Sequence, residues 1–268
     1  MAIRIGCGSW ADAEYVGVLY PKGLPAAERL RTYATRFPRV ELNNTYYATP
    51  SAAQMTAWAD QTPRDFLFDF KLHRAFSERP ETSGDLVEKL AAAVDPLQRM
   101  GKLGCFLLTL APSFGPARHR LTEIDALLKN LPPGVPLAVE LRHRGWVEGK
   151  SREATLDFFR ERKLAWVALD LPDLALPSLL PVIDEVTNPQ LAYMRLHGRN
   201  PGWAKAKTAA ERHQWDYSPE ELREIAARIR NLADLAEHVH VSVNNHAEDF
   251  APKAALALQD LLAARAGG

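Results

Sequence analysis

The chain has 268 residues, and its 33 Lys and Arg residues balance its 33 Asp and Glu residues, so it carries no formal net charge. Proteins that bind nucleic acid through its phosphates usually have a basic excess, so this balance disfavours that class, although a local basic patch is compatible with it. No apolar run approaches the ~18 residues that span a membrane, and the only two cysteines, Cys7 and Cys105, form no CxxC pair. We therefore expect a soluble, cytoplasmic protein without a membrane partner.

Eight short, mostly apolar runs alternate along the chain with helical or loop-rich stretches. Each run is bounded by Pro, Gly or charged residues, as strands commonly are. Consecutive runs are separated by about the length of a βα repeat, which predicts successive parallel βαβ units. The predicted strands are residues 3–9, 40–44, 66–72, 105–110, 137–142, 165–170, 191–197 and 239–244. The length fits one α/β domain, a single (β/α)8 TIM barrel over residues 1–268.

Helix signals fall between these strands. The pattern predicts helices over residues 26–37, 51–60 and 85–100, another after Ser218, and a last helix that starts at Pro252. Pro96 is expected to kink the third helix or to end it early. The connection over residues 171–188 holds three prolines and predicts no regular helix. The connection over residues 198–217 is long and rich in Trp, Lys and Arg, which favours a lid and, as the alternative, a surface for a polyanion.

Polar residues of one parity recur near the ends of the predicted strands. Side chains alternate between the two faces of a strand, and in a closed barrel one parity points inward. We take the polar parity as the inward one, and expect a site at the carboxyl end, where barrel enzymes have theirs. The predicted inward residues are Glu41, Asn43, Asp69, Lys71, Glu140, Arg142, Asp170, Arg195, His197, Ser242 and Asn244, with His246 in phase beyond them. The four acids and three permanent cations can largely neutralise one another.

Simpler interpretations exist for several of these residues. Some of the charges could form a purely structural ion network. The other histidines, His119, His213, His238 and His240, are expected at the surface or in caps, and the two cysteines in the core. Glu41, Glu140, His197 and His246 could converge as metal ligands, but three cations in the same mouth disfavour a metal. We therefore predict no cofactor and no metal, with a divalent metal as the alternative.

Several segments resemble one known family. They are IGCGSW at residues 5–10, ELNNTYY at 41–47, FLFDFKLHR at 66–74, LAPSF at 110–114, AVELRHRGW at 138–146, RLHGR at 195–199 and VNNH at 243–246. In these segments the chain is similar to the YecE-like family, domain of unknown function 72. The resemblance implies a TIM barrel and no assigned activity. Two departures from the family pattern are Ala11-Asp12 in place of a second glycine–tryptophan element and Val243 in place of an aromatic residue.

The charged mouth favours an enzyme that acts on a small anionic or polyhydroxylated substrate. Glu140 is the expected general acid/base, with Lys71 and His197 as proton-transfer partners, and Lys71 could instead form a Schiff base. We expect Glu140→Gln to harm function more than stability, because an open mouth would screen the neighbouring cations. The expected substrate-binding residues are Glu41, Asn43, Arg142, Asp170, Arg195, Asn244, Asn245, His246, Trp10 and Tyr46. The alternatives are a nucleic-acid barrel resembling metal-dependent apurinic endonucleases and a non-catalytic binding barrel.

Overall fold

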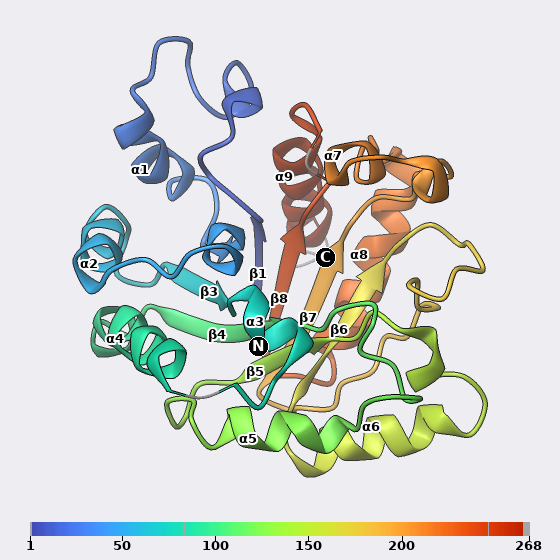
Figure 1. The fold of residues 1–268 in the computed structure, drawn as a ribbon. Coiled ribbons are helices and arrows are strands. Elements are labelled where there is room, and N and C mark those ends of the chain that lie inside the picture. The colour runs from blue at the N-terminus through green and yellow to red at the C-terminus, as the bar shows by residue number, and fades with distance from the viewer. Residues whose placement is uncertain (1, 83, 246, 265–268) are drawn as a thin grey trace.

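Eight parallel strands surrounded by helices form a (β/α)8 barrel (Figure 1). The structure is a computed structural model that describes residues 2–82, 84–245 and 247–264. The strands pair in the order β1-β8-β7-β6-β5-β4-β3-β2. They are β1 (Ala2–Cys7), β2 (Arg39–Leu42), β3 (Leu67–Lys71), β4 (Leu103–Thr109), β5 (Leu137–Glu140), β6 (Ala165–Asp170), β7 (Leu191–Leu196) and β8 (His238–Val243). All eight predicted strands are confirmed, with ends that differ by at most two residues.

The helices differ more from the prediction. The α-helices are α1 (Arg29–Tyr33), α2 (Ala52–Asp60), α3 (Arg74–Glu78), α4 (Asp85–Arg99), α5 (Ile124–Leu128), α6 (Ser151–Glu161), α7 (Ala209–Arg212), α8 (Pro219–Ala233) and α9 (Phe250–Ala263). Short 3-10 helices are η1 (Ala13–Tyr15), η2 (Ala26–Glu28), η3 (Asn43–Tyr46), η4 (Leu121–Glu123), η5 (Arg144–Trp146) and η6 (Trp203–Lys205). As predicted, residues 171–188 contain no helix. None of the helices in the described ranges has the length and apolar character to cross a membrane.

Local sequence features mark the start of α8 and the last turns of α4. At the start of α8, the Ser218 hydroxyl accepts from the Glu221 backbone N–H at 3.2 Å, and the Glu221 carboxylate accepts from the Ser218 N–H at 2.8 Å. This capping box satisfies two otherwise unpaired donors. Of the two outcomes predicted for Pro96, a kink or an early end of the helix, the early end is wrong, because Pro96 lies inside α4. The proline removes one backbone donor close to the end of the helix, and buried residues on either side, Val94 and Leu97, keep its apolar face against the barrel.

The seam between β1 and β2 is joined by a tyrosine hydroxyl. Tyr33 is fully buried at the end of α1, and its hydroxyl accepts from the Cys7 N–H at 2.7 Å and donates to the Arg39 carbonyl at 3.0 Å. The two strands lie so close that a Cβ on Gly6 would come within 2.1 Å of the Arg39 carbonyl oxygen. A glycine at position 6 and the Tyr33 hydroxyl therefore allow the eight strands to close on themselves.

Tyr33→Phe is expected to lower the free energy of unfolding by about 2–3 kcal/mol, since it leaves a buried N–H and a buried carbonyl without a partner. Equilibrium urea unfolding measures this loss. The control is Tyr47→Phe, because Tyr47 is 72% exposed and its substitution should change stability by less than about 0.5 kcal/mol. Equal stability of the two variants would contradict this role for Tyr33.

The barrel interior is divided between apolar and charged sectors. An apolar cluster fills it on the side of β4 to β7 and contains Cys105, Leu107, Ala138, Ala165, Val167, Leu169, Leu191 and Tyr193. Charged side chains from β2, β3, β5 and β7 fill the rest, and they lie in two layers. The larger apolar core lies between the outside of the sheet and the helices.

Candidate active site at the carboxyl end of the barrel

The lower charged layer is built on Arg39 and Asp69, which form an ion pair with no solvent exposure on either side chain. Arg39 also donates to the Tyr193 hydroxyl at 2.7 Å and to the Val241 carbonyl at 2.6 Å. His240 Nδ1 lies 3.0 Å from Asp69 Oδ2. Burial opposes ionisation of Asp69, but Arg39 and His240 together hold the pKa of its carboxyl well below the usual range. His240 is therefore an interior residue, and the prediction of a surface or capping role for it is wrong.

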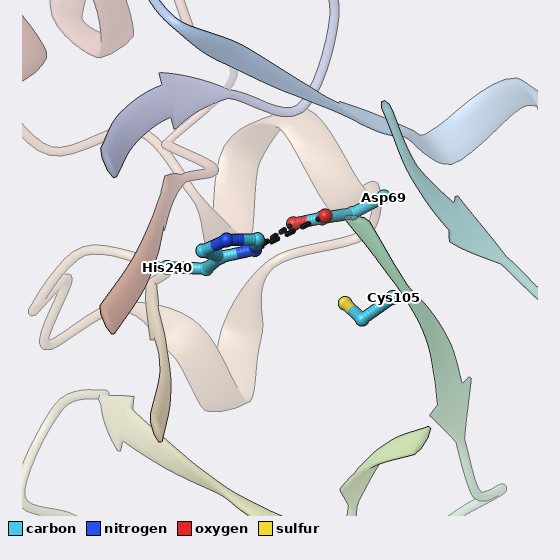
Figure 2. A group of neighbouring side chains, drawn as sticks. All are labelled: Asp69, Cys105 and His240. Carbon is cyan, nitrogen blue, oxygen red and sulfur yellow. Dashed lines mark hydrogen bonds and ion pairs between the residues drawn. The ribbon is translucent and has the colours of Figure 1, made fainter. Parts of the chain in front are cut away.

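Asp69, Cys105 and His240 meet inside the barrel as a possible set of metal ligands (Figure 2). Their potential ligand atoms lie within 4.8 Å of one another. However, the Asp69 carboxylate already pairs with the Arg39 guanidinium, whose positive charge would repel a cation. Burial also raises the pKa of the Cys105 thiol, so the thiolate that binds metals is disfavoured. This cluster suits a structural ion pair better than a metal.

The upper layer centres on Arg195, which is bound between two carboxylates. Its Nη2 donates to Glu41 Oε1 at 2.6 Å, its Nε donates to Glu41 Oε2 at 3.1 Å, and its Nη1 forms a very short contact with Glu140 Oε2. The Tyr193 hydroxyl donates to Glu41 Oε2 at 2.8 Å and so links the two layers. All three nitrogens of Arg195 are engaged and its side chain is 2% exposed. Arg195 therefore holds the two glutamates rather than facing the mouth.

Glu140 connects this buried pair to the open end of the barrel. Its Oε1 accepts from Arg142 Nε at 2.5 Å, and its Oε2 lies 3.6 Å from His197 Nε2. Burial raises the pKa of Glu140, but Arg142 and Arg195 outweigh it and hold that pKa well below its usual range. A carboxylate that stays ionised at neutral pH is a weak proton acceptor and no proton donor. Glu140 is thus placed to orient two arginines.

Lys71 and His197 have pKa values that suit proton transfer better. Burial, with Arg195 and Arg142 nearby, lowers the pKa of Lys71 to about 7. Its Nζ donates to Asn43 Oδ1 at 3.1 Å and lies 4.7 Å from the centre of the Tyr46 ring. Burial and the Arg195 charge lower the pKa of His197 to about 4, so its ring is neutral at pH 7.

The remaining predicted residues lie around this centre in different settings. The Asn43 side chain donates to Asn244 Oδ1 at 2.9 Å, which ties β2 to the end of β8. Asn245 donates to the Trp215 carbonyl at 2.7 Å and so fixes the 198–217 connection. Trp10 lines a hollow of about 340 Å³ together with Glu41, Asn43 and Tyr47. His246 lies outside the described residues.

Asp170 does not belong to the site, so its predicted inward position is wrong. Its carboxylate accepts from Arg199 and Arg228, both at 2.7 Å, and from the Tyr217 hydroxyl at 2.8 Å. Arg228 is on α8, so this network joins the outside of β6 to a helix. The inward residues of β6 are Val167 and Leu169, of the opposite parity.

A second cavity, of about 160 Å³, lies against the carboxyl ends of β5 and β7. Glu140, Arg142 and His197 form one part of its wall, and the 198–217 connection contributes Trp203, Arg212 and His213. The sequence predicts the connection as a lid but does not assign its individual residues to the site. His213, expected at the surface or in a cap, instead lines this cavity.

Arg39, Tyr193 and His240 were also missed, although the sequence holds a signal for them. Each stands two residues before an inward polar residue, so the same alternation places it on the inner face.

Fold and site together define a (β/α)8 barrel with a buried ion network and a cavity at its carboxyl end. The family model "Protein of unknown function DUF72" matches residues 4–268, and the chain belongs to this family. The UPF0759 protein YunF of Bacillus subtilis is 27% identical over 255 residues, which are 91% of this chain and 89% of that protein. The UPF0759 protein YecE of Escherichia coli K12 is 31% identical over 157 residues, 58% of this chain and 54% of that protein.

Solved structures agree with the fold. A crystal structure of a DUF72 family protein from Thermotoga maritima matches with a TM-score of 0.86 and 29% identity, over 98% of this chain and 100% of that one. A DUF72 family protein from Enterococcus faecalis matches with a TM-score of 0.83 and 24% identity, over 98% of each chain, and supports the fold alone. The names of these relatives state no activity, so the reaction has to be inferred from the site.

Proposed function

We propose that this protein is an enzyme that acts on a small anionic or polyhydroxylated substrate by general acid–base chemistry. The observation that carries the proposal is the cavity at the carboxyl end of β5 and β7, walled by Glu140, Arg142 and His197. Barrel enzymes have their active sites at this end, and a concave site with convergent polar groups is where a small molecule binds. Near it, the pKa of Lys71 is lowered to about 7 and that of His197 to about 4. Displaced pKa values of this kind are common among catalytic groups.

In the proposed reaction Lys71 transfers the proton. With a pKa of about 7 it is present in both protonation states at neutral pH, which is the condition for an efficient acid or base. The neutral His197 ring offers one donor and one acceptor to the substrate. Glu140 holds Arg142 at the cavity, and Trp10 and Asn43 in the larger hollow contact the hydroxylated part of the substrate. The same Lys71 amine could add to a substrate carbonyl as a Schiff base.

We propose that this chemistry proceeds without a bound metal ion and in the cytoplasm. The cations Lys71, Arg142 and Arg195 lie near the carboxylates that would have to hold a metal, and they already neutralise them. Cys7 and Cys105 are free and buried thiols, which suits a reducing compartment.

The test is to incubate the protein in D2O with separate sets of sugar phosphates, free sugars and hydroxy acids, and to follow deuterium incorporation and turnover by proton NMR. We expect exchange in at least one set, a loss of about 10²–10⁴-fold in Lys71→Met, and no effect of a chelator. The control is Lys205→Met, because Lys205 is exposed on η6, whereas Lys71 bonds to Asn43 in the wall of the larger hollow. Absence of exchange in all sets, or full activity of Lys71→Met, would contradict the proposal, and loss of activity with a chelator would favour a metal enzyme.

A further inference from the structure

Arg212 gives the smaller cavity a cation with no ion-pair partner in the described part of the chain. It lies at the end of α7 in the 198–217 connection and lines the same cavity as Arg142. Its Nε donates to the Thr208 carbonyl at 3.3 Å. Within residues 2–82, 84–245 and 247–264, no carboxylate lies within ion-pair distance of it. The two terminal nitrogens of this guanidinium are therefore available for a ligand.

Arg142 presents a second guanidinium to the same space. Among the described residues, only its Nε is used, in the bond to Glu140, and its side chain remains 36% exposed. Among the described residues that line this cavity, the two cations Arg142 and Arg212 meet the single carboxylate Glu140, which also pairs with the buried Arg195. The lining therefore carries a net positive charge, which favours an anion.

His197 adds a buried ring whose Nε2 lies 3.6 Å from Glu140 Oε2, beyond hydrogen-bond distance. Its side chain is 6% exposed and lines the cavity, and neither of its ring nitrogens has a hydrogen-bond partner among the described residues. A buried polar atom without a hydrogen bond is energetically unfavourable. An oxygen-rich ligand in the cavity would remove that penalty by accepting from one ring nitrogen.

The volume limits the size of the ligand group. An apolar cavity of about 150 Å³ holds a benzene-sized molecule, so the 160 Å³ here accommodates a phosphoryl group and the first atoms attached to it. The planar forks of two arginines match the oxygens of a phosphate.

We propose that this cavity binds the phosphoryl group of a small phosphate ester between Arg142 and Arg212, with His197 donating a further hydrogen bond. The inference rests on the proposed function, and it narrows the substrate class to phosphorylated small molecules. The hydroxylated remainder of the substrate then extends toward Lys71 and the hollow beside Trp10 and Asn43.

The test measures the binding of inorganic phosphate to the full chain by calorimetry at constant ionic strength, with acetate as the carboxylate probe. We expect phosphate to bind more tightly than acetate, and Arg212→Met to weaken phosphate binding by about 10- to 100-fold, as loss of a charged hydrogen bond does. Lys205→Met removes one positive charge from the same connection outside the cavity and should bind like the wild type. Arg212→Lys should fall between the wild type and Arg212→Met. Thermal melting of each variant verifies that it is folded.

Three results would overturn the inference. They are no phosphate binding by the wild-type protein, equal binding by wild type and Arg212→Met, and a preference for acetate. Turnover of unphosphorylated compounds without phosphate binding would overturn this inference and leave the proposed function intact. Phosphate binding that depends on Arg212, without turnover of any compound, would support the anion site and contradict the enzyme.

Discussion

Glu140→Gln is expected to lower the free energy of unfolding by about 3–5 kcal/mol, because removing one partner of a buried ion pair leaves the other charge uncompensated. Arg195 is 2% exposed and is bound on one side by Glu41 and on the other by Glu140. The amide of Gln keeps the volume but supplies no charge, so Arg195 loses half of its compensation. Equilibrium denaturation of the two proteins at pH 7 measures the loss.

A matched control is Glu148→Gln. Glu148 is also paired with an arginine, Arg144, at 3.6 Å, but its side chain is 64% exposed. Exposed pairs contribute about 0–1 kcal/mol, so this variant should be close to the wild type. If Glu140→Gln also stayed within about 1 kcal/mol of the wild type, Glu140 would be free of the scaffold, and the acid/base role expected from the sequence would regain support. The sequence alone predicts only a small loss of stability in Glu140→Gln, because it places Arg195 in an open mouth. Arg195 is instead buried, and a large loss is expected.

Lys71→Met is expected to have the opposite effect on stability, with a gain of about 1 kcal/mol or more at pH 7. The charged form of Lys71 is opposed first by burial and then by Arg195 and Arg142. The methionine keeps most of the side-chain length and removes that repulsion. Loss of the Asn43 hydrogen bond and the Tyr46 contact limits the gain. Denaturation of both proteins at pH 7, 8 and 9 gives the difference and its pH dependence.

The pH dependence has a definite sign. Lys71 has a pKa of about 7 in the folded state, and a lysine in an unfolded chain has one of about 10.4. Between these values the unfolded state binds more protons, so this residue makes the folded state more stable as the pH rises. The advantage of Lys71→Met should therefore shrink from pH 7 to 9, by at most about 1.4 kcal/mol per pH unit. A constant difference, or a large loss of stability in Lys71→Met, would show that Lys71 is an ordinary paired lysine.

The sequence predicts the fold well because strand periodicity and βα spacing survive in every unit. It predicts much of the site because Glu41, Lys71, Glu140 and Arg195 share one parity on separate strands, and the structure places all four inside the barrel. The same rule fails at Asp170, where the outer face of β6 meets Arg228 of α8 in an ion network. A polar residue marks the inward face only where the outward face is purely apolar.

Other parts of the site depend on contacts that no local pattern records. The alternation extends to Arg39 and His240, but the ion pairs that bury them join residues 30 and 171 positions apart. Arg212 is one of several basic residues in the 198–217 connection, and only the course of that connection places it over the cavity.

The central claim is that Lys71 exchanges protons near neutral pH beside an anion-binding cavity. It is tested most directly by NMR titration of the side chains of isotopically labelled lysines, with the Lys71 signal assigned by its disappearance in Lys71→Met. The account predicts a midpoint near pH 7 for this one signal, displaced from the ordinary lysine value of about 10.4. A midpoint at or above pH 10 would contradict the account, because Lys71 would then remain fully charged at neutral pH and could not serve as the base.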